Sequence, residues 1–124
     1  WIEITTLIIP GLNDYPDELK KAADFIVSVG EDIPWHISAF YPTYRMTDRP
    51  PTSAAALHEA RAIGLAAGLR YVYTGNIAGQ GGEDTLCHAC GAVLIERRGY
   101  SIAANSITNG ACPACCAPCA GIFE

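Results

Sequence analysis

Strand-like and helix-like patterns of apolar residues alternate through the first 76 residues. Short β-branched or aromatic runs suit strands, whereas apolar residues spaced three and four apart suit helices. We expect strands over residues 1–9, 34–40 and 70–74, with a helix from about Pro16 to Gly30 and an alanine-rich helix from Thr52 or Ser53 to about residue 67. The order strand–helix–strand–helix–strand predicts parallel strands joined by right-handed crossovers.

The faces of these strands differ in character. Strict alternation in the first strand places Glu3, Thr5, Leu7 and Ile9 on one face. Apolar residues on the opposite face suggest a strand covered on both sides, as is usual in a parallel sheet. Three parallel strands leave open edges and do not close a barrel, so we expect this part of the chain to belong to a larger fold. The loops that follow the strands, residues 10–14, 41–48 and 75–82, are where ligands bind in α/β barrels.

The last third of the chain contains all six cysteines. Two C-x2-C pairs, Cys87 with Cys90 and Cys112 with Cys115, are separated by residues 91–111, a spacing that suits four thiolates around one zinc ion. Two short strands are expected between the pairs, over residues 92–96 and 97–102. The sequence therefore predicts a zinc ribbon. Gly91 follows the first pair, but Cys116 stands at the corresponding place after the second.

Other uses of the six cysteines remain open. Disulfides are disfavoured because the composition is that of an intracellular enzyme. An iron–sulfur cluster is also held by cysteine thiolates, and Cys116 and Cys119 could supply extra ligands. With zinc on the first four cysteines, these two are spare thiols.

Composition changes near residue 77, which predicts two parts: residues 1–76 as the βαβαβ portion and residues 77–124 as a small Cys-rich domain that needs metal to fold. Net charge is −5, and the eight basic residues are scattered apart from one Arg-Arg pair. We therefore expect neither nucleic acid nor membrane as a partner, and a cytoplasmic location. The chain begins with Trp1, which suggests that an upstream part is missing.

Several of these segments together resemble the C-terminal half of the radical SAM enzyme of the AmmeMemoRadiSam system, a relative of the pyruvate formate-lyase activating enzymes. The resemblance covers essentially the whole chain and is carried by residues 3–14, 34–42, 51–52 and 68–76 and by the cysteine pairs. It implies the C-terminal part of a partial (β/α)6 TIM-like barrel followed by a zinc-ribbon-like domain. It also implies S-adenosylmethionine and a 4Fe-4S cluster as cofactors of the full-length enzyme, which cleaves S-adenosylmethionine reductively to a 5′-deoxyadenosyl radical.

The resemblance also assigns roles to particular residues. In the family, the cluster loop Cys-x3-Cys-x2-Cys lies in the N-terminal half of the barrel, so the chain is expected to be inactive alone and to need that missing half. Ile9, Pro10 and Gly11 match part of the family motif Gly-x-Ile-x-Gly-x-x-Glu, in which the isoleucine packs on adenine. Leu7 and Asp14 replace its glycine and glutamate. A protein substrate or partner proteins of the same system would be the binding partners.

Five polar residues are candidates for lining the substrate cavity, since inward polar groups in a barrel are costly unless they are used. These are Glu3, Thr5, His36, Ser38 and Asn76. A hydrogen-bonded core histidine is the ordinary alternative for His36, and a turn cap is the alternative for Asn76. Two other functions remain possible: the same enzyme with an auxiliary iron–sulfur cluster on the C-terminal cysteines, or an independent zinc-ribbon interaction module.

Overall fold

The computed structural model describes residues 1–123, which separate into two compact units. Residues 2–82 form the first, here called the sheet unit, and residues 83–123 are grouped with Trp1 in the second, the ribbon unit. The boundary falls a few residues beyond residue 76, because the loop after the third strand folds back on the sheet: Thr74 N–H donates to Gly82 O at 3.0 Å, and Thr74 Oγ1 to Gly81 O at 2.7 Å.

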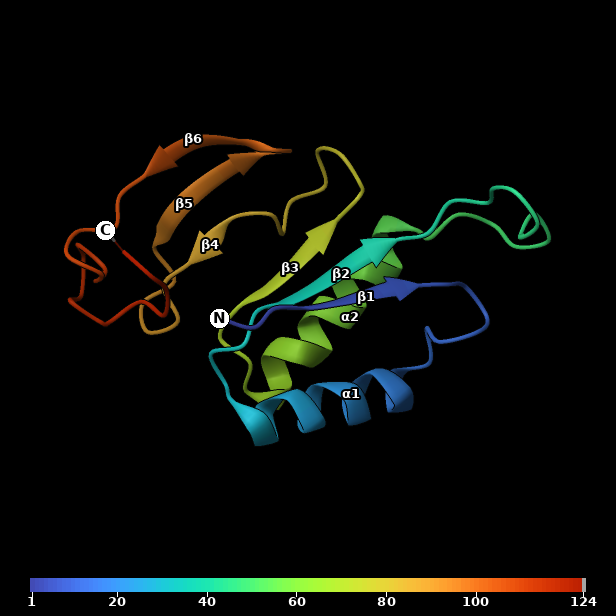
Figure 1. Cartoon of the computed structure of the whole chain (residues 1–124), viewed down its shortest axis with the longest axis horizontal. Helices are drawn as coiled ribbons and strands as arrows, with labels where there is room; N and C mark the ends of the chain where they lie inside the picture. Colours follow the sequence, from blue (N-terminus) through green and yellow to red (C-terminus); the bar gives the residue numbers. More distant parts are fainter. Residues whose placement is uncertain (124) are drawn as a thin grey trace. The chain divides into compact units, whose positions relative to one another are not determined.

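The sheet unit contains three parallel strands in the order β1 (Ile4–Ile8), β2 (Trp35–Ala39) and β3 (Val72–Gly75), coloured from blue to yellow-green in Figure 1. Thr5, His36 and Tyr73 stand side by side in the register, as do Leu7, Ser38 and Gly75 two residues later. The strands are shorter than predicted, but their order and parallel pairing are as expected. The polar candidates of β1 and β2 consequently lie in adjacent rows.

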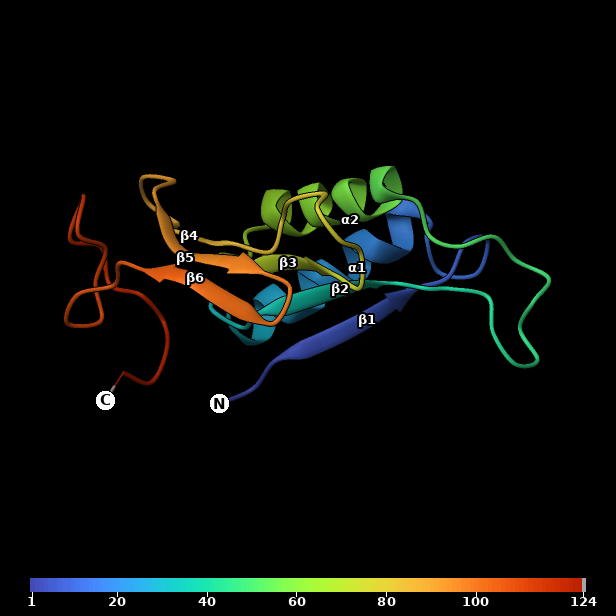
Figure 2. The same cartoon turned by 90° about the horizontal axis from the view of Figure 1, so that it is seen from above.

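Both helices, α1 (Pro16–Val29) and α2 (Ala54–Ala67), pack on one face of this sheet (Figures 1 and 2). Leu19, Ala23 and Ile26 of α1 join Leu57 and Ala60 of α2 in one core with the inward strand residues Ile8, Trp35, Ile37, Ala39 and Val72. The first strand was expected to be covered on both sides, and within the sheet unit the helices cover one face. Right-handed crossovers between strands in the sequential order 1-2-3 all pass on the same side, so the second face receives no helix.

Helix α2 approaches the sheet closely at Gly64, which is buried against Trp35. A Cβ atom at this position would lie 2.9 Å from Trp35 Cε3 and 3.1 Å from Val72 Cγ2. The indole of Trp35 is fully buried, and its Nε1–H donates to Thr6 Oγ1 at 2.8 Å. The missing side chain of Gly64 is therefore what lets a buried tryptophan fit beneath the helix.

Thr52 was one of the two residues expected to cap α2, but it has a different role. Ser53 is the N-cap of α2, and its Oγ accepts from Ala56 N–H at 3.1 Å. Thr52 is buried, donates through Oγ1 to Ile8 O at 2.6 Å and accepts from Phe40 N–H at 2.8 Å. Its hydroxyl therefore ties the ends of β1 and β2 together where the last ladder bonds stop.

The ribbon unit is an antiparallel sheet of β4 (Thr85–Leu86), β5 (Val93–Arg98) and β6 (Ser101–Asn105), in that order. The predicted break between residues 96 and 97 was wrong, because Arg97 and Arg98 continue β5 and the turn comes at Gly99, whose φ is +59°. A two-residue strand such as β4 is too short to give a periodic signal, so it was not predicted.

The sheet unit alone leaves β1 and β3 as its two edges and does not close. The structure is thus mixed α/β with two small sheets, and it contains no barrel within residues 1–123. None of the helices in this range has an apolar stretch long enough to cross a membrane.

Candidate metal centre

The two C-x2-C pairs adopt the same backbone turn, here called a knuckle. In the first, Cys87 N–H donates to Ala92 O at 2.8 Å and Gly91 N–H donates to Cys87 O at 2.9 Å. In the second, the corresponding bonds run from Cys112 N–H to Ala117 O and from Cys116 N–H to Cys112 O, both at 2.9 Å. Each knuckle therefore holds its two sulfurs on the same side of a closed turn.

Cys116 takes the conformation that glycine takes in the first knuckle. The φ angles are +76° at Gly91 and +62° at Cys116. A residue with a Cβ atom is strained in this left-handed region by about 1–2 kcal/mol. The knuckle closes in spite of this cost, which means that the thiol positions of Cys112 and Cys115 are kept at the expense of backbone strain.

The four thiols converge on one point. Cys87 Sγ lies 3.6 Å from Cys115 Sγ, Cys90 Sγ lies 3.7 Å from Cys112 Sγ, and all four sulfurs are within 4.8 Å of one another. A tetrahedral zinc site with metal–sulfur bonds of about 2.3 Å requires sulfur–sulfur edges of about 3.8 Å. The predicted quartet is therefore brought together with the spacing of ligands that share a single ion.

Burial is unequal within this quartet. Cys87 and Cys112, the first cysteine of each knuckle, are buried with Leu94 in a small apolar cluster, whereas Cys90 and Cys115 are exposed. Ala92, Ile95, Ile107, Ala117 and Cys119 pack partly buried around that cluster. Leu94 is the one large aliphatic side chain fully buried within the described part of the ribbon unit.

The pKa values of Cys87 and Cys115 move in opposite directions within the quartet. Backbone N–H groups of Cys90 and Ala89 donate to the thiolate of Cys87 and lower its pKa from 9.0 to about 6. The N–H of Ala117 acts in the same direction on Cys115, but the neighbouring thiols of Cys90 and Cys87 outweigh it and raise the pKa of Cys115 to about 12. One thiolate is favoured and further ones are opposed, which is the situation that a divalent cation relieves.

The other two cysteines lie outside the quartet. Cys116 is exposed, and Cys119 is half-buried beside the apolar cluster, where desolvation followed by the charges of Cys87 and Cys112 raises its pKa. Cys119 N–H donates to Gly110 O at 2.8 Å, which fixes the chain after the second knuckle.

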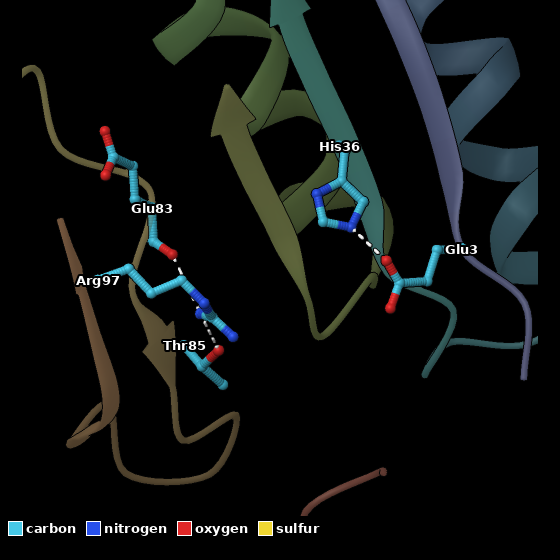
Figure 3. A network of polar contacts seen from close by, with 5 residues as sticks. All are labelled: Glu3, His36, Glu83, Thr85 and Arg97. Atoms are coloured by element: carbon cyan, nitrogen blue, oxygen red, sulfur yellow. Dashed lines mark hydrogen bonds and ion pairs between the residues drawn. The ribbon is translucent and has the colours of Figure 1, made fainter. Parts of the chain in front are cut away.

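Arg97 connects β5 to the start of the ribbon unit and was not singled out from the sequence. Its backbone N–H donates to Asp84 Oδ1 at 2.7 Å, and its guanidinium donates to Glu83 O at 3.2 Å and to Thr85 Oγ1 at 2.6 Å (Figure 3). An Arg-Arg pair in a charged stretch gives no signal for such a role, because the partners are set by the fold of β4 against β5.

In the sheet unit, the structure brings together two of the five cavity candidates. His36 Nε2 lies 2.9 Å from Glu3 Oε2 (Figure 3). The His36 ring also stacks on Tyr73, with centroids 5.2 Å apart and planes at 27°. Thr5 is next to His36 in the register, and Ser38 lies one row further toward the strand ends. Tyr73 was missed because only the register of β3 against β2 reveals that it shares a row with His36.

Asn76 and the turn after β1 mainly serve the backbone. Asn76 has φ of +59°, and its Nδ2 donates to Ala39 O at 2.9 Å, so it joins the ends of β3 and β2 as a turn residue. Ile9 is half-buried, with its N–H donated to Asn13 Oδ1 at 2.7 Å. Gly11 N–H donates to Asp14 Oδ1 at 2.8 Å, while Pro10 O accepts from Arg49 Nη1 at 2.9 Å.

The chain is similar to the uncharacterized protein MJ0808 of Methanocaldococcus jannaschii, with 46% identity over 98 residues. The matched region covers 78% of this chain but 29% of that protein, so the chain spans less than a third of its relative's length. No protein-family model matches the chain, and no solved structure matches it either.

Proposed function

We propose that the ribbon unit is a structural zinc ribbon, with the ion held by Cys87, Cys90, Cys112 and Cys115. The observation that carries this proposal is the convergence of four thiols from two matching knuckles, with sulfur–sulfur distances of 3.6 and 3.7 Å. Four thiolates complete the tetrahedral shell of zinc, and a catalytic zinc needs an open position for water or substrate. A complete shell therefore favours a structural ion over a catalytic one.

The small size of the ribbon core supports the structural role. Its fully or nearly buried apolar members are Leu94 and two of the ligand cysteines themselves. A core of this size supplies little hydrophobic stabilisation, and units of this kind usually obtain their folding free energy from a metal. The ion would stabilise the folded ribbon unit, as the larger hydrophobic core stabilises the sheet unit.

An iron–sulfur cluster is the alternative on the same cysteines. Ligands of a multinuclear cluster bind different irons, so their sulfurs lie further apart than sulfurs that share one ion. The 4.8 Å limit on all sulfur pairs favours a mononuclear site. A single tetrahedral iron would fit the same quartet, and elemental analysis distinguishes it from zinc.

For the sheet unit, we propose that it is part of the barrel of a radical SAM enzyme, as the sequence resemblance implies. Sequential strand order with both helices on one face is the arrangement of successive units in an α/β barrel, where the second face becomes the interior. The helix-free face carries Glu3, Thr5, His36 and Ser38, which would then line a cavity. MJ0808 is more than three times as long as the matched region, so a relative of this chain has length for further strands.

This chain would supply only some of the residues that bind the cofactors of that enzyme. All six cysteines lie in the ribbon unit, and the one Cys-x3-Cys-x2-Cys spacing among them, Cys112, Cys116 and Cys119, takes Cys112 from the proposed zinc quartet. With zinc on that quartet, a radical-generating cluster would be held elsewhere in the protein. Ile9 and the turn through Pro10 and Gly11 lie at the carboxyl end of β1, where ligands bind in α/β barrels. Ile9 would contribute an apolar surface for the adenine of S-adenosylmethionine, which supplies the radical when cleaved.

The coding sequence before Trp1 gives the first test of the enzyme proposal. A Cys-x3-Cys-x2-Cys loop there would support it, and the longer protein should then form 5′-deoxyadenosine and methionine from S-adenosylmethionine when reduced. A start codon directly before Trp1 would contradict it and favour an independent interaction module.

A further inference from the structure

The ion pair of Glu3 and His36 fixes which nitrogen of the imidazole carries a hydrogen. An ionised carboxylate only accepts hydrogen bonds, so the ring nitrogen that faces it must donate. Glu3 Oε2 is 2.9 Å from Nε2 of His36 (Figure 3). The neutral ring is consequently the Nε2–H tautomer, and Nδ1 carries a lone pair that can accept a hydrogen bond or a proton.

The orientation of the ring is fixed from a second side. Tyr73, the neighbour of His36 in the β2–β3 register, stacks on the imidazole with centroids 5.2 Å apart. A carboxylate directly before β1 and an aromatic ring on β3 therefore hold His36 from two sides. Such dual support is how proteins position an imidazole whose second nitrogen is used.

The next row toward the carboxyl ends of the strands carries short side chains beside this group. Ser38 and Gly75 pair in the register, and Ser38 Oγ lies 3.2 Å from where a Cβ of Gly75 would stand. A Cβ at Gly75 would crowd that hydroxyl, so glycine at this position leaves the space beside Ser38 Oγ unfilled. Leu7, 44% exposed, is the third member of the row. Ligands of parallel α/β sheets bind toward this end of the strands.

We propose that the helix-free face binds a polar small molecule through a hydroxyl or amino group, which donates to Nδ1 of His36 while Ser38 makes a second hydrogen bond. Glu3 and Tyr73 are positioning residues, and His36 takes the proton of the bound group if the reaction releases one. This inference rests on the proposed function only in that the face lines a cavity, and it does not require zinc or a radical.

Histidine ¹⁵N spectra of the chain test the tautomer. The His36 signal, assigned by its loss in His36→Gln, should show the Nε2–H form when neutral. Glu3→Gln should increase the Nδ1–H form, because a carboxamide can donate as well as accept. Glu18→Gln, which removes an exposed carboxylate from α1, should leave the signal unchanged. A neutral His36 with hydrogen on Nδ1 in the wild-type chain would overturn the proposal.

Binding is tested with a pair of matched probes. Ethylene glycol offers two hydroxyl donors and 1,2-dimethoxyethane offers none. Ethylene glycol should shift the His36 Nδ1 resonance saturably, with at least a several-fold weaker response in Ser38→Ala, whereas the dimethyl ether should leave it in place. Equal responses to the two probes, or none to either, would overturn the proposal. Neither spectrum depends on metal content or on cleavage of S-adenosylmethionine. A failure of this binding proposal is therefore distinguishable from a failure of the proposed function.

Discussion

Gly91 and Cys116 occupy equivalent positions in the two knuckles, each directly after the second ligand and each with positive φ, +76° and +62°. Their N–H groups make the same bond, to the carbonyl of the first cysteine of their own knuckle, at 2.9 Å in both. The two knuckles differ in that one of them carries a Cβ atom in the left-handed region.

Cys116→Gly should stabilise the ribbon unit. The substitution removes a left-handed strain of about 1–2 kcal/mol and adds chain entropy worth about 0.5–1 kcal/mol to the unfolded state, so the net gain is about 0.5–1 kcal/mol. Denaturant unfolding of the metal-loaded chain measures it. Gly91→Ala is the matched control, because nothing lies within 4 Å of the added Cβ and only the φ angle is tested. It should destabilise by about 0.5–1 kcal/mol, because the same entropy difference offsets part of the strain. A loss of stability in Cys116→Gly would mean that the thiol itself is needed.

Cys87→Ser and Cys112→Ser should each unfold the ribbon unit and leave the sheet unit folded. Both cysteines are buried, and loss of one removes a ligand and breaks the apolar cluster around Leu94. The helices α1 and α2 belong to a separate core, so the far-ultraviolet helical signal should be largely retained. Cys116→Ser, outside the quartet, should keep the metal and the ribbon fold. Wild-type melting of the ribbon in either ligand variant would show that the zinc assignment is wrong.

Thr52→Val should destabilise the sheet unit by about 1–3 kcal/mol, because it leaves Ile8 O and Phe40 N–H buried without their bridging hydroxyl. Thr52→Ser keeps the hydroxyl and should cost less. Removal of the neighbouring helix cap in Ser53→Ala should cost about 1 kcal/mol. Urea unfolding followed by circular dichroism gives all three values, and a Thr52→Val loss no larger than that of Thr52→Ser would exclude the bridging role.

Metal affinity should fall with decreasing pH, and the fall should steepen below about pH 6. The pKa of Cys87 is lowered from 9.0 to about 6, so this thiolate is mostly formed at pH 7 and competes with protons only below that range. The pKa of Cys115 is raised to about 12, so its proton must be displaced at every pH below that value. Binding at pH 7 should thus release fewer than four protons per ion.

The lowered pKa of Cys87 also makes the stability of the metal-free ribbon unit depend on pH. The lowered pKa of Cys87 contributes stability that is present above about pH 9 and lost as the pH falls through about 6. Competition with a chelator of known affinity between pH 5 and 9 measures the slope of affinity against pH. A constant slope across pH 6 would contradict the lowered pKa of Cys87.

Much of the fold could be predicted from the sequence, because its signals are local. Neighbouring residues are enough to predict the strands, the start of α1 at Pro16, its end at Gly30 and the cap before α2. The choice between Thr52 and Ser53 as cap was not local: it depended on Ile8 and Phe40, which lie far away in the chain. The turn at Gly99 was misplaced because the β propensity of residues 92–102 is continuous and the register is fixed by β6.

The convergence of the four cysteines could be predicted because the spacing of the two C-x2-C pairs is itself the signal. His36 and Glu3 were each predicted to line the cavity, but their pairing was not, since alternation within one strand gives sides and not distances between strands. The role of Tyr73 could not be predicted, because it follows from the register of β3 against β2. For Asn76 the sequence offered a ligand contact or a turn cap, and its left-handed backbone agrees with the turn cap.

Metal and sulfide content, with a visible absorption spectrum, of the chain purified without oxygen is the most direct test of the zinc ribbon. We expect one zinc per chain, no sulfide and no visible colour. Iron with sulfide and a brown colour would contradict the account and assign these cysteines to a redox cluster.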